Sequence, residues 1–292
     1  MGTTAEDTGR VAGKTVLITG VSTGIGFAIA EDLMQRGYLV CGAVRRLADA
    51  DGLVTRWGQA FVPLVFDVTD RTALNQAVTQ VDEVLGGRYL AALINNAGIG
   101  PSAPLLMQPE EEIRKIFDVN VFGLLAVTRA FLPALGARSG GTGPKGRVIN
   151  MGSVSGVMTL PFMGAYSSSK HAVEAVGQAL RRELKFMGID VTTIEPGFIR
   201  TAMFEKTRTE LKNDRYANSD YGPMWQRFTA MLMQQESKAA PMSVVLEAVR
   251  HALESTRPRI RYPLDKAWHI GRWMPDRAFD KALFRMLGVN AK

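Results

Sequence analysis

The stretch that decides the fold is Thr15-Val-Leu-Ile-Thr-Gly-Val-Ser-Thr-Gly-Ile-Gly26. Its β-branched start predicts a buried strand, and its glycines lead into a helical pattern over residues 27–36. Glycines let the backbone approach a phosphate closely, while the N-terminus of the following helix offers free N–H groups and the positive end of a dipole. An ordinary tight turn rarely needs three glycines at the spacing G-x-x-x-G-x-G. We therefore predict a phosphate site built from Gly20, Ser22, Thr23, Gly24, Ile25 and Gly26.

The same strand-and-helix unit recurs along the chain, because short apolar runs alternate with helical patterns such as residues 113–135. Strands that are buried on both faces read as short, continuous apolar segments. Their alternation with helices predicts an α/β fold with a doubly wound parallel sheet. The strands are expected at residues 15–19, 39–44, 61–66, 90–95, 148–151 and 191–194.

Length and composition limit the classes of protein to which this chain can belong. With 292 residues, of which 46% are hydrophobic and 22% charged, the chain can form a soluble domain with a sizeable core. No apolar run approaches the ~20 residues of a membrane-spanning helix, and the start lacks the apolar core of a signal peptide. The lone Cys41 excludes an internal disulfide and favours a reducing compartment. We expect a cytoplasmic protein with an N-terminal extension, residues 1–13, one domain, residues 14–292, and no metal site.

The net charge of +7 raises the question of nucleic-acid or membrane binding. Most of the excess lies in the tail, residues 257–292, which holds nine Lys/Arg and three Asp/Glu. The tail has no run of consecutive basic residues and no nucleic-acid-binding motif, so we interpret it as solvated and expect no nucleic-acid partner. Its aromatic residues, Trp268 and Trp273 among them, make contact with a membrane surface an alternative that we do not favour.

The end of the second expected strand indicates which dinucleotide binds. NAD-specific sites place an acidic residue about 20 positions beyond the glycines, where it binds the ribose hydroxyls. Here no acid stands between Asp32 and Asp49, and the strand closes with Val44-Arg45-Arg46. A guanidinium at this point can pair with a 2′-phosphate. We therefore favour NADP(H), with Arg45 as the stronger candidate because it directly follows the strand; the alternative is that both arginines are solvated loop charges.

Polar and small residues mark three further points. Asp67-Val68 closes the third expected strand, where a carboxylate could reach an adenine amine. The sequence Asn-Asn-Ala-Gly over residues 95–98 closes the fourth and leaves room for a flat ligand. Asn120 lies inside a long helical pattern, where a buried amide needs a partner, unless it caps the helix or faces solvent.

Tyr166 and Lys170 stand four residues apart at the start of another helical pattern, so the phenol and the ammonium share one helix face. A free tyrosine titrates near pH ~10. A neighbouring lysine charge is expected to lower that pKa toward neutrality, where general acid–base catalysis operates. Ser153 offers a hydroxyl that could hold a substrate oxygen beside the phenol.

In their order and spacing, these motifs resemble the short-chain dehydrogenase/reductase family. The residues that carry the resemblance are Thr19-Gly-x-x-x-Gly-Ile-Gly26, Asn95-Asn-Ala-Gly98, Asn120, Ser153, Tyr166-x-x-x-Lys170 and Pro196-Gly197. The resemblance implies a Rossmann-type α/β/α sandwich with about seven parallel strands, the last near residues 259–262. Segments 43–45, 152–156 and 200–206 are similar to the cluster of 17β-hydroxysteroid dehydrogenase type 1 and retinol dehydrogenases, which implies a hydrophobic carbonyl or alcohol substrate.

The resemblance also implies roles for single residues. Tyr166 would protonate a carbonyl oxygen that Ser153 holds, and Lys170 would lower the tyrosine pKa and bind the nicotinamide ribose. Asn120 would support a proton relay as the fourth catalytic residue. Beyond the glycine turn and Arg45 and Arg46, the expected cofactor contacts are Asp67, Val68, Asn96, Ala97, Gly98, Tyr166, Lys170, Pro196, Gly197, Ile199 and Thr201. The family further implies a homodimer or homotetramer formed through the helices that contain Asn120 and Tyr166.

Residues 198–241 form the predicted substrate loop, since they follow the Pro196-Gly197 turn beside the expected active site. Apolar residues recur at helical spacing within it, a pattern that fits a core face as well as a lid over an apolar substrate. They are Tyr221, Trp225, Phe228 and Leu232.

The alternative to an enzyme is a non-catalytic NADP(H)-binding redox sensor or regulator of the same fold. A sensor has no chemical need for the four predicted catalytic residues together, and all four are present. We therefore favour an NADP(H)-dependent carbonyl reductase that also works as an alcohol dehydrogenase.

Overall fold

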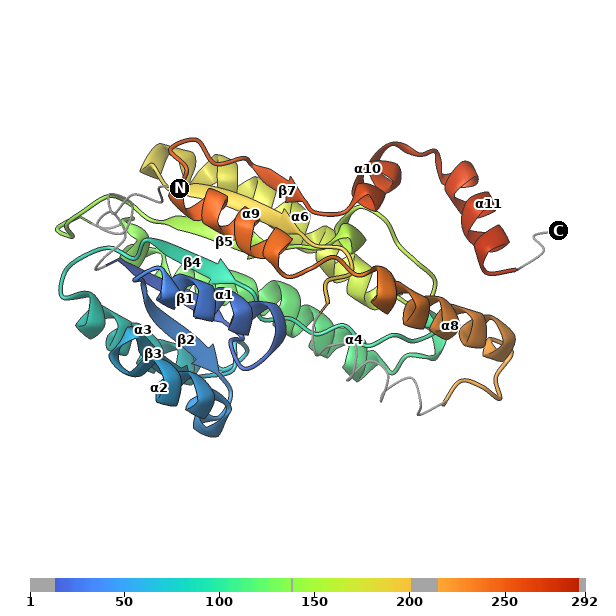
Figure 1. Ribbon diagram of the computed structural model, residues 1–292, viewed down its shortest axis with the longest axis horizontal. Coiled ribbons are helices and arrows are strands. Elements are labelled where there is room, and N and C mark those ends of the chain that lie inside the picture. The colour runs from blue at the N-terminus through green and yellow to red at the C-terminus, as the bar shows by residue number, and fades with distance from the viewer. Residues whose placement is uncertain (1–13, 138, 201–214, 289–292) are drawn as a thin grey trace, which may run out of the picture.

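Seven parallel strands form one sheet in the order β3-β2-β1-β4-β5-β6-β7, as a computed structural model shows (Figure 1). The structure describes residues 14–137, 139–200 and 215–288. The strands are β1 Thr15–Thr19, β2 Leu39–Val44, β3 Phe61–Val65, β4 Ala92–Asn95, β5 Arg147–Met151, β6 Asp190–Glu195 and β7 Arg261–Pro263. Because the winding reverses between β1 and β4, the carboxyl ends of the strands open into a crevice there.

All six strands expected from the sequence are present, and a seventh lies close to the expected place. The first two have the expected bounds, while the others differ by one or two residues at their ends. The sixth strand runs one residue further than its apolar run, to the buried acid Glu195. The seventh begins at Arg261 instead of residue 259. The doubly wound parallel sheet is therefore confirmed.

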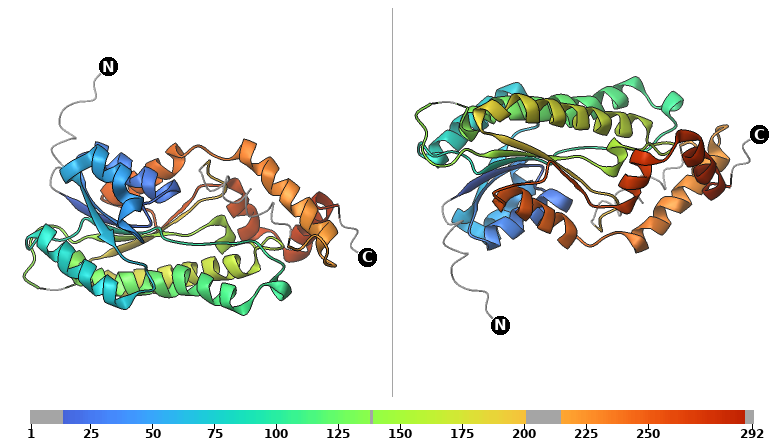
Figure 2. Two further views of the ribbon diagram at one scale, coloured as in Figure 1. Left: turned by 90° about the horizontal axis from the view of Figure 1, so that it is seen from below. Right: turned by 90° about the horizontal axis from the view of Figure 1, so that it is seen from above.

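Helices cover both faces of the sheet (Figures 1 and 2). One face carries α1 Gly24–Gln35, α2 Asp51–Trp57 and α9 Ser243–Glu254, which bury apolar side chains against β1 and β2. The other face carries α3 Arg71–Leu85, α5 Leu124–Phe131 and α6 Gly164–Glu183. Short 3-10 turns are η2 Leu47–Ala50, η3 Gly58–Ala60, η4 Leu105–Met107, η6 Pro133–Leu135, η7 Val154–Gly156 and η8 Lys185–Met187. Cys41 lies buried within β2, and burial raises the pKa of its thiol to about 12, as expected for an inert cysteine.

The helical pattern over residues 113–135 is not one regular helix. It consists of α4 Glu110–Phe117, the π-helical turn η5 Asp118–Gly123, α5 and η6. The π turn contains Asn120, whose side chain is buried, so the alternative of an exposed amide is wrong. Single π turns inside α-helices are rare and frequently mark functional sites, which makes this turn the first place to examine.

The C-terminal third adds three helices beyond the sheet: α8 Gly222–Lys238, α10 Lys266–Trp273 and α11 Asp276–Met286. Figure 2 shows them together at one end of the molecule. An apolar cluster joins α8 to α11 and to the loop before α6; its buried members include Phe162, Trp225, Phe228, Leu232, Leu283 and Leu287. The interpretation of residues 257–292 as a solvated tail is therefore wrong for Trp268, Leu283 and Leu287, which are buried, whereas Ile260, Ile270, Trp273 and Met286 are exposed. Within the described ranges, no helix is long and apolar enough to cross a membrane.

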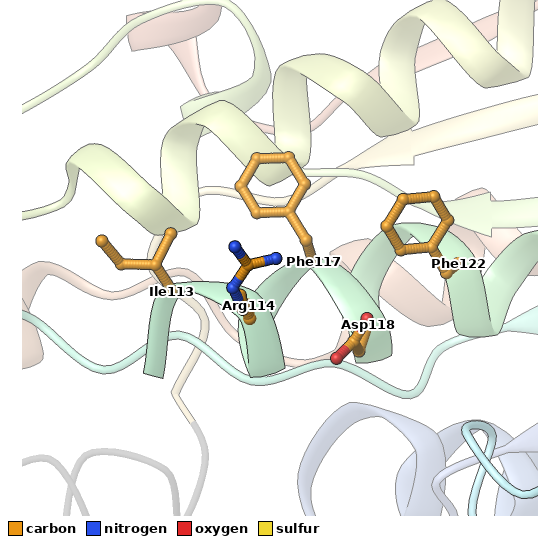
Figure 3. Close-up of a pocket in the computed structure, with 5 residues that line it drawn as sticks. All are labelled: Ile113, Arg114, Phe117, Asp118 and Phe122. Carbon is orange, nitrogen blue, oxygen red and sulfur yellow. The ribbon is translucent and has the colours of Figure 1, made fainter. Parts of the chain in front are cut away.

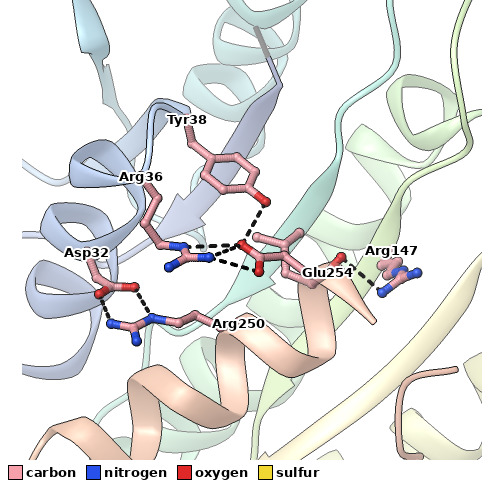
Figure 4. A network of polar contacts seen from close by, with 7 residues as sticks. Asp32, Arg36, Tyr38, Arg147, Arg250 and Glu254 are labelled. Atoms are coloured by element: carbon pink, nitrogen blue, oxygen red, sulfur yellow. Dashed lines mark hydrogen bonds and ion pairs between the residues drawn. The ribbon is translucent and has the colours of Figure 1, made fainter. Parts of the chain in front are cut away.

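A polar network joins α1 to α9 across more than 200 residues of sequence (Figure 4). Arg250 of α9 pairs with the buried carboxylate of Asp32, and Arg36 pairs with Glu254 through two nitrogens. Arg147 of β5 donates to the carbonyls of Ala252 and Leu253 at 2.8 and 2.9 Å, and so satisfies the last turn of α9. The network fixes the helix that begins at the glycine turn against the helix that follows the predicted substrate loop.

Candidate active site

The glycine turn is built so closely that only glycine fits at its last position. A Cβ on Gly26 would lie 2.2 Å from the carbonyl oxygen of Gly20 and 2.3 Å from Nδ2 of Asn96. Gly20 itself adopts φ +72°, in the left-handed region that favours glycine. The amide of Asn96 donates to the carbonyls of Thr19 and Gly20 at 2.9 and 3.0 Å, which ties the end of β4 to the turn after β1. Asn96 thus shapes this turn from the neighbouring strand.

No side chain in the described part of the chain caps the N–H groups at the N-terminus of α1. Thr23 occupies the N-cap with an extended backbone and makes no capping hydrogen bond, and the first turn contains no acidic residue. Ser22 and Ile25 are half-buried, while Thr23 is exposed and Gly24 has open space around its Cα. Free N–H groups and an uncompensated dipole at a glycine turn suit a phosphate group.

The two arginines after β2 differ in their surroundings. Arg46 pairs with Asp49 at 2.7 Å, and this ion pair raises the pKa of the guanidinium and lowers that of the carboxyl. Arg45 is exposed and makes no ion pair or side-chain hydrogen bond with any residue that the structure describes. Asp49 is the first acid after the strand, and its charge is engaged by Arg46. Arg45 therefore remains available for an anion at this edge.

Asp67 and Val68 follow the carboxyl end of β3, at the same edge of the sheet as the glycine turn and Arg45. The carboxylate of Asp67 accepts from the amide and the hydroxyl of Thr69 at 2.9 and 2.7 Å. Val68 is buried and fills the space beside Gly123 of the π turn, where a Cβ would come within 2.6 Å of it. Val68 therefore joins the β3 edge to η5.

The side chain of Asn120 connects two neighbouring segments. Its Oδ1 accepts from the amide of Ile99 at 2.9 Å, and its Nδ2 donates to the carbonyl of Ile99 at 2.8 Å and to Oγ of Ser169 at 2.9 Å. Gly98 packs closely against this amide, because a Cβ on Gly98 would lie 3.2 Å from Oδ1 of Asn120. Asn120 thus fixes the loop after β4 against α6, and both hydrogens of its amide are used in doing so.

Ser153, Tyr166 and Lys170 lie together beside this loop. Ser153 ends an extended segment after β5, and its hydroxyl accepts from the amide of Ser155 at 3.1 Å. The side chain of Ser153 lies near enough to the phenol of Tyr166 to act on its pKa. The ammonium of Lys170 lies 5.8 Å from the centre of the Tyr166 ring and donates to the carbonyl of Met151 at 2.8 Å. The structure therefore brings together the three side chains that the sequence predicted to act as one group.

The protonation of this group differs from the expectation. Burial raises the pKa of Tyr166, and the side chain of Ser153 offsets that effect only in part. The pKa of Lys170 falls to about 8 because its ammonium is buried, while the charge of Glu174 opposes the fall. The pKa of Tyr166 is therefore raised and not lowered, because desolvation of the phenol dominates in this structure; the effect of Lys170 on the phenol stays a prediction.

The segment after β6 returns to the same crevice. The carbonyl of Pro196 accepts from the amide of Val154 at 2.9 Å. Gly197 packs so closely on Asp265 that a Cβ would lie 2.1 Å from its carboxylate. Ile199 is buried and pairs with Ala240 as an isolated bridge, which closes the base of the segment 198–241. Thr201 lies outside the described residues.

Three neighbours of the group were not predicted from the sequence. Gly100 lies against the ring of Tyr166, since a Cβ would come within 2.5 Å of it. Ser169 connects Asn120 to α6 by donating to the carbonyl of Tyr166 at 2.7 Å. Glu174 is buried one turn beyond Lys170. A signal for Glu174 was present, because it interrupts an apolar helix face with a charge, whereas Gly100 and Ser169 stand out only in three dimensions.

This arrangement can transfer a proton to an oxygen held between a serine hydroxyl and a phenol, beside a crevice suited to a dinucleotide. Residues 14–212 match the sequence profile of the short chain dehydrogenase family. The protein therefore belongs to this family of oxidoreductases, whose members bind a nicotinamide cofactor and act on small molecules.

Named relatives agree with this assignment. The NADPH-dependent 3-dehydrocapnine reductase of Ornithobacterium rhinotracheale is 37% identical over 275 residues, which are 93% of this chain and 96% of the relative. Retinol dehydrogenase 16 of Homo sapiens is 34% identical over 260 residues, 85% of this chain and 80% of the relative. A crystal structure of a short-chain dehydrogenase from Streptomyces avermitilis has a TM-score of 0.74 at 27% identity, and covers 93% of this chain and 95% of that one. The resemblance to the retinol dehydrogenase cluster is thus confirmed.

Proposed function

We propose that the protein is an NADP(H)-dependent oxidoreductase that reduces the carbonyl group of a hydrophobic substrate, with Asn120, Ser153, Tyr166 and Lys170 as its catalytic residues. The observation that supports the proposal most is that Ser153 and Lys170 lie beside Tyr166 at the carboxyl ends of the central strands, with the ammonium of Lys170 5.8 Å from the centre of the tyrosine ring. Ligands bind at this edge in open α/β sheets. A non-catalytic sensor would not need this group.

The residues present fit a dinucleotide with a 2′-phosphate. Gly26 and Gly20 leave the space that a pyrophosphate needs, and the uncapped start of α1 supplies N–H donors. Arg45 is the free cation beside β2 that would pair with the 2′-phosphate, in place of the acid that binds a free ribose hydroxyl. The name of the NADPH-dependent relative supports the same choice. Asp67 and Val68 would hold the adenine, and Ile199 and Thr201 the carboxamide.

The chain's own residues would manage the proton. A bound nicotinamide supplies or accepts the hydride. Ser153 donates a hydrogen bond to the substrate oxygen and stabilises the negative charge that develops there. Tyr166 gives its proton to that oxygen as the bond to carbon changes from double to single. Lys170, held by Met151, places a positive charge beside the phenol and stabilises the phenolate that remains, while Asn120 keeps the loop of Ile99 in place.

The raised pKa of Tyr166 favours one direction. A phenol that stays protonated at neutral pH is ready to act as an acid but is a poor base. We therefore infer that carbonyl reduction is the direction for which the free enzyme is prepared, and that alcohol oxidation accelerates as the pH rises toward the pKa of the phenol. Rates in both directions between pH 6 and 10 would measure this, and an oxidation rate that does not rise with pH would contradict it.

The test of cofactor choice compares Arg45→Ala with Arg46→Ala. Loss of a charged hydrogen-bond partner costs about 1.5–3 kcal/mol, so Arg45→Ala should weaken NADPH about 10- to 100-fold and leave NADH nearly unchanged. Arg46, already paired with Asp49, should matter less. Binding is measured by nucleotide fluorescence. Equal losses of affinity for both nucleotides would contradict the assignment of Arg45.

The test of the substrate class measures turnover with a panel that runs from small aliphatic carbonyls to steroids, retinal and aromatic diketones. Turnover limited to small polar carbonyls would contradict a hydrophobic substrate.

A second copy of the chain is the partner we propose for the outer surface of α4 and η5. A depression of about 280 Å³ there is lined by Ile113, Arg114, Phe117, Asp118 and Phe122 (Figure 3). Phe117 and Phe122 point to the same side, and Phe122 is 54% exposed. An exposed aromatic surface on these helices suits the homodimer or homotetramer. Phe122→Glu should lower the mass measured by light scattering, whereas Val54→Glu on α2 should not; an unchanged mass for Phe122→Glu would remove this surface from the interface.

A further inference from the structure

Two glutamates are buried directly behind Lys170, from two different elements. Glu174 lies one turn beyond Lys170 on α6, and Glu195 is the last residue of β6. Glu195 is fully buried and Glu174 nearly so. Burying two acids side by side opposes folding unless each charge is paired or neutralised. We therefore examined which groups pair with or neutralise these two carboxyl groups.

The segment that carries Ser153 is shaped around Glu174. A Cβ on Gly152 would lie 2.7 Å from Oε1 of Glu174, and one on Gly156 would lie 2.9 Å from its Cγ. The glycines on both sides of Ser153 thus leave the room that the glutamate occupies. Glu174 therefore packs against the backbone on both sides of Ser153.

A single cation joins the two acids. Nη2 of Arg261, on β7, lies 2.9 Å from Oε2 of Glu174, and its Nη1 lies 3.4 Å from Oε1 of Glu195. One guanidinium neutralises one of the two carboxylates. Both carboxylate oxygens of Glu174 and Oε2 of Glu195 are buried without a hydrogen-bond partner in the described part of the chain. A proton kept on one carboxyl group supplies a donor for the other and removes the excess charge.

The two acids do not share this proton equally. Burial and the charge of Glu174 raise the pKa of Glu195 to about 8, although Arg261 and Trp268 act to lower it. Burial also raises the pKa of Glu174, but Arg261, the hydrogen bond from Glu195, Lys170 and His171 all act to lower it. At neutral pH, Glu195 is therefore the protonated acid and donor, and Glu174 is the carboxylate whose charge acts on Lys170, one helical turn away.

We propose that Glu174, held by Arg261 beside Glu195, is a positioning residue that keeps the buried ammonium of Lys170 charged. This inference rests on the proposed function, since it assigns a purpose to the charge of Lys170. In this role Glu174 acts on Tyr166 through the charge of Lys170. The carboxylate opposes the loss of the lysine proton that burial favours. The carboxylate of Glu174 thus raises the pH at which Lys170 loses its proton, and so the highest pH at which Tyr166 has a positive charge beside it.

The experiment compares three isosteric amides: Glu174→Gln, Glu195→Gln and, as a matched control, Glu183→Gln, an exposed glutamate of the same helix. The readout independent of activity is the titration of Lys170, followed by NMR of protein labelled with ¹³C at the lysine ε carbon. The signal absent from Lys170→Met identifies the residue. The second readout is the pH dependence of kcat/KM for carbonyl reduction, with circular dichroism to establish that each variant is folded.

We expect Lys170 to titrate near pH 8 in the unchanged protein, as burial dictates. Glu174→Gln should lower this midpoint by about one pH unit or more, and the alkaline limb of kcat/KM should move with it. Glu195→Gln resembles the protonated acid, so it should keep the Lys170 midpoint near that of the unchanged protein, as should Glu183→Gln.

An unchanged Lys170 midpoint in folded Glu174→Gln would overturn the proposal, as would an equal fall in Glu195→Gln. If Glu174→Gln does not fold, Glu174→Asp retains the charge one methylene further away and should shift the midpoint in the same direction by less; no shift there would also overturn it. Absence of turnover with every carbonyl would count against the proposed function, whereas the NMR titration would still decide the role of Glu174.

Discussion

The cofactor crevice and the C-terminal helices are built by different means. In the crevice, strand ends place single residues, and the spacing is so tight that a Cβ on Gly26 would meet a carbonyl oxygen at 2.2 Å. Helices α8 and α11 lie beyond the sheet and are held by an apolar cluster around Phe162 and Phe228. The difference teaches that the first region depends on particular residues at particular positions, while the second depends on matched apolar volume. Substitutions should therefore affect function in one region and stability in the other.

The largest effect is expected at the catalytic group. Tyr166→Phe removes the proton donor but keeps the ring that packs on Gly100. Loss of a general acid lowers turnover about 100- to 10,000-fold, so kcat should fall by this amount while NADPH affinity stays within about twofold. Steady-state kinetics and fluorescence titration measure the two quantities. Retained turnover would remove Tyr166 from the mechanism.

In the C-terminal region, Phe228→Ala should act on stability. Phe228 is fully buried; its ring meets Phe162 edge-on at a centroid distance of 5.2 Å and lies tilted against Trp225 at 6.0 Å. Truncation of a buried phenylalanine lowers the free energy of unfolding by about 3–5 kcal/mol. Urea unfolding measures this loss, and NADPH binding by the folded variant should be preserved.

The matched control is Phe186→Ala, because Phe186 is 81% exposed and its truncation should change the stability by less than about 0.5 kcal/mol. A loss below about 1 kcal/mol for Phe228→Ala would show that the cluster is not what holds α8 in place.

A smaller effect on stability, but a specific one on binding, is expected for Gly26→Ala. The added methyl group meets Gly20 and Asn96, which should cost about 1–3 kcal/mol of stability and weaken NADPH at least about tenfold. Gly52→Ala in α2 is the control, since nothing lies within 4 Å of its Cβ and its φ is not positive. It should stabilise the helix slightly, by about 0.5–1 kcal/mol. Equal NADPH affinity in both variants would show that the glycine turn does not hold the phosphates of the cofactor.

The smallest effect concerns the link between the two regions. Asp32→Asn breaks the ion pair with Arg250, whose Nε lies 2.9 Å from Oδ2 of Asp32. Partly exposed pairs contribute about 1 kcal/mol or less, so the variant should lose roughly that much. A double-mutant cycle with Arg250→Ala isolates the pair itself, and a coupling energy of zero would show that α9 is held by apolar contacts alone.

The sequence predicted the sheet well because each strand is a short apolar run between recognisable turns. It also placed Ser153, Tyr166 and Lys170 together correctly. It did not predict the π turn at Asn120, since apolar spacing does not distinguish one extra residue in a helical turn. Nor did it predict the raised pKa of Tyr166, because burial of the phenol depends on Gly100 and other residues distant in sequence. The predicted lid stays a prediction: Trp225, Phe228 and Leu232 belong to a core face, and residues 201–214 lie outside the described part of the chain.

The position of β1 in the middle of the sheet has a consequence for the order of folding. The pairs β1–β2 and β2–β3 join neighbouring segments and can form early, whereas β1 must keep its other edge free until residues 92–94 arrive. The contacts between α1 and α9 span 218 residues and close last, since long loops are costly to close before other contacts support them. A nascent chain therefore holds one half of its nucleotide crevice exposed while most of the protein is still to be made.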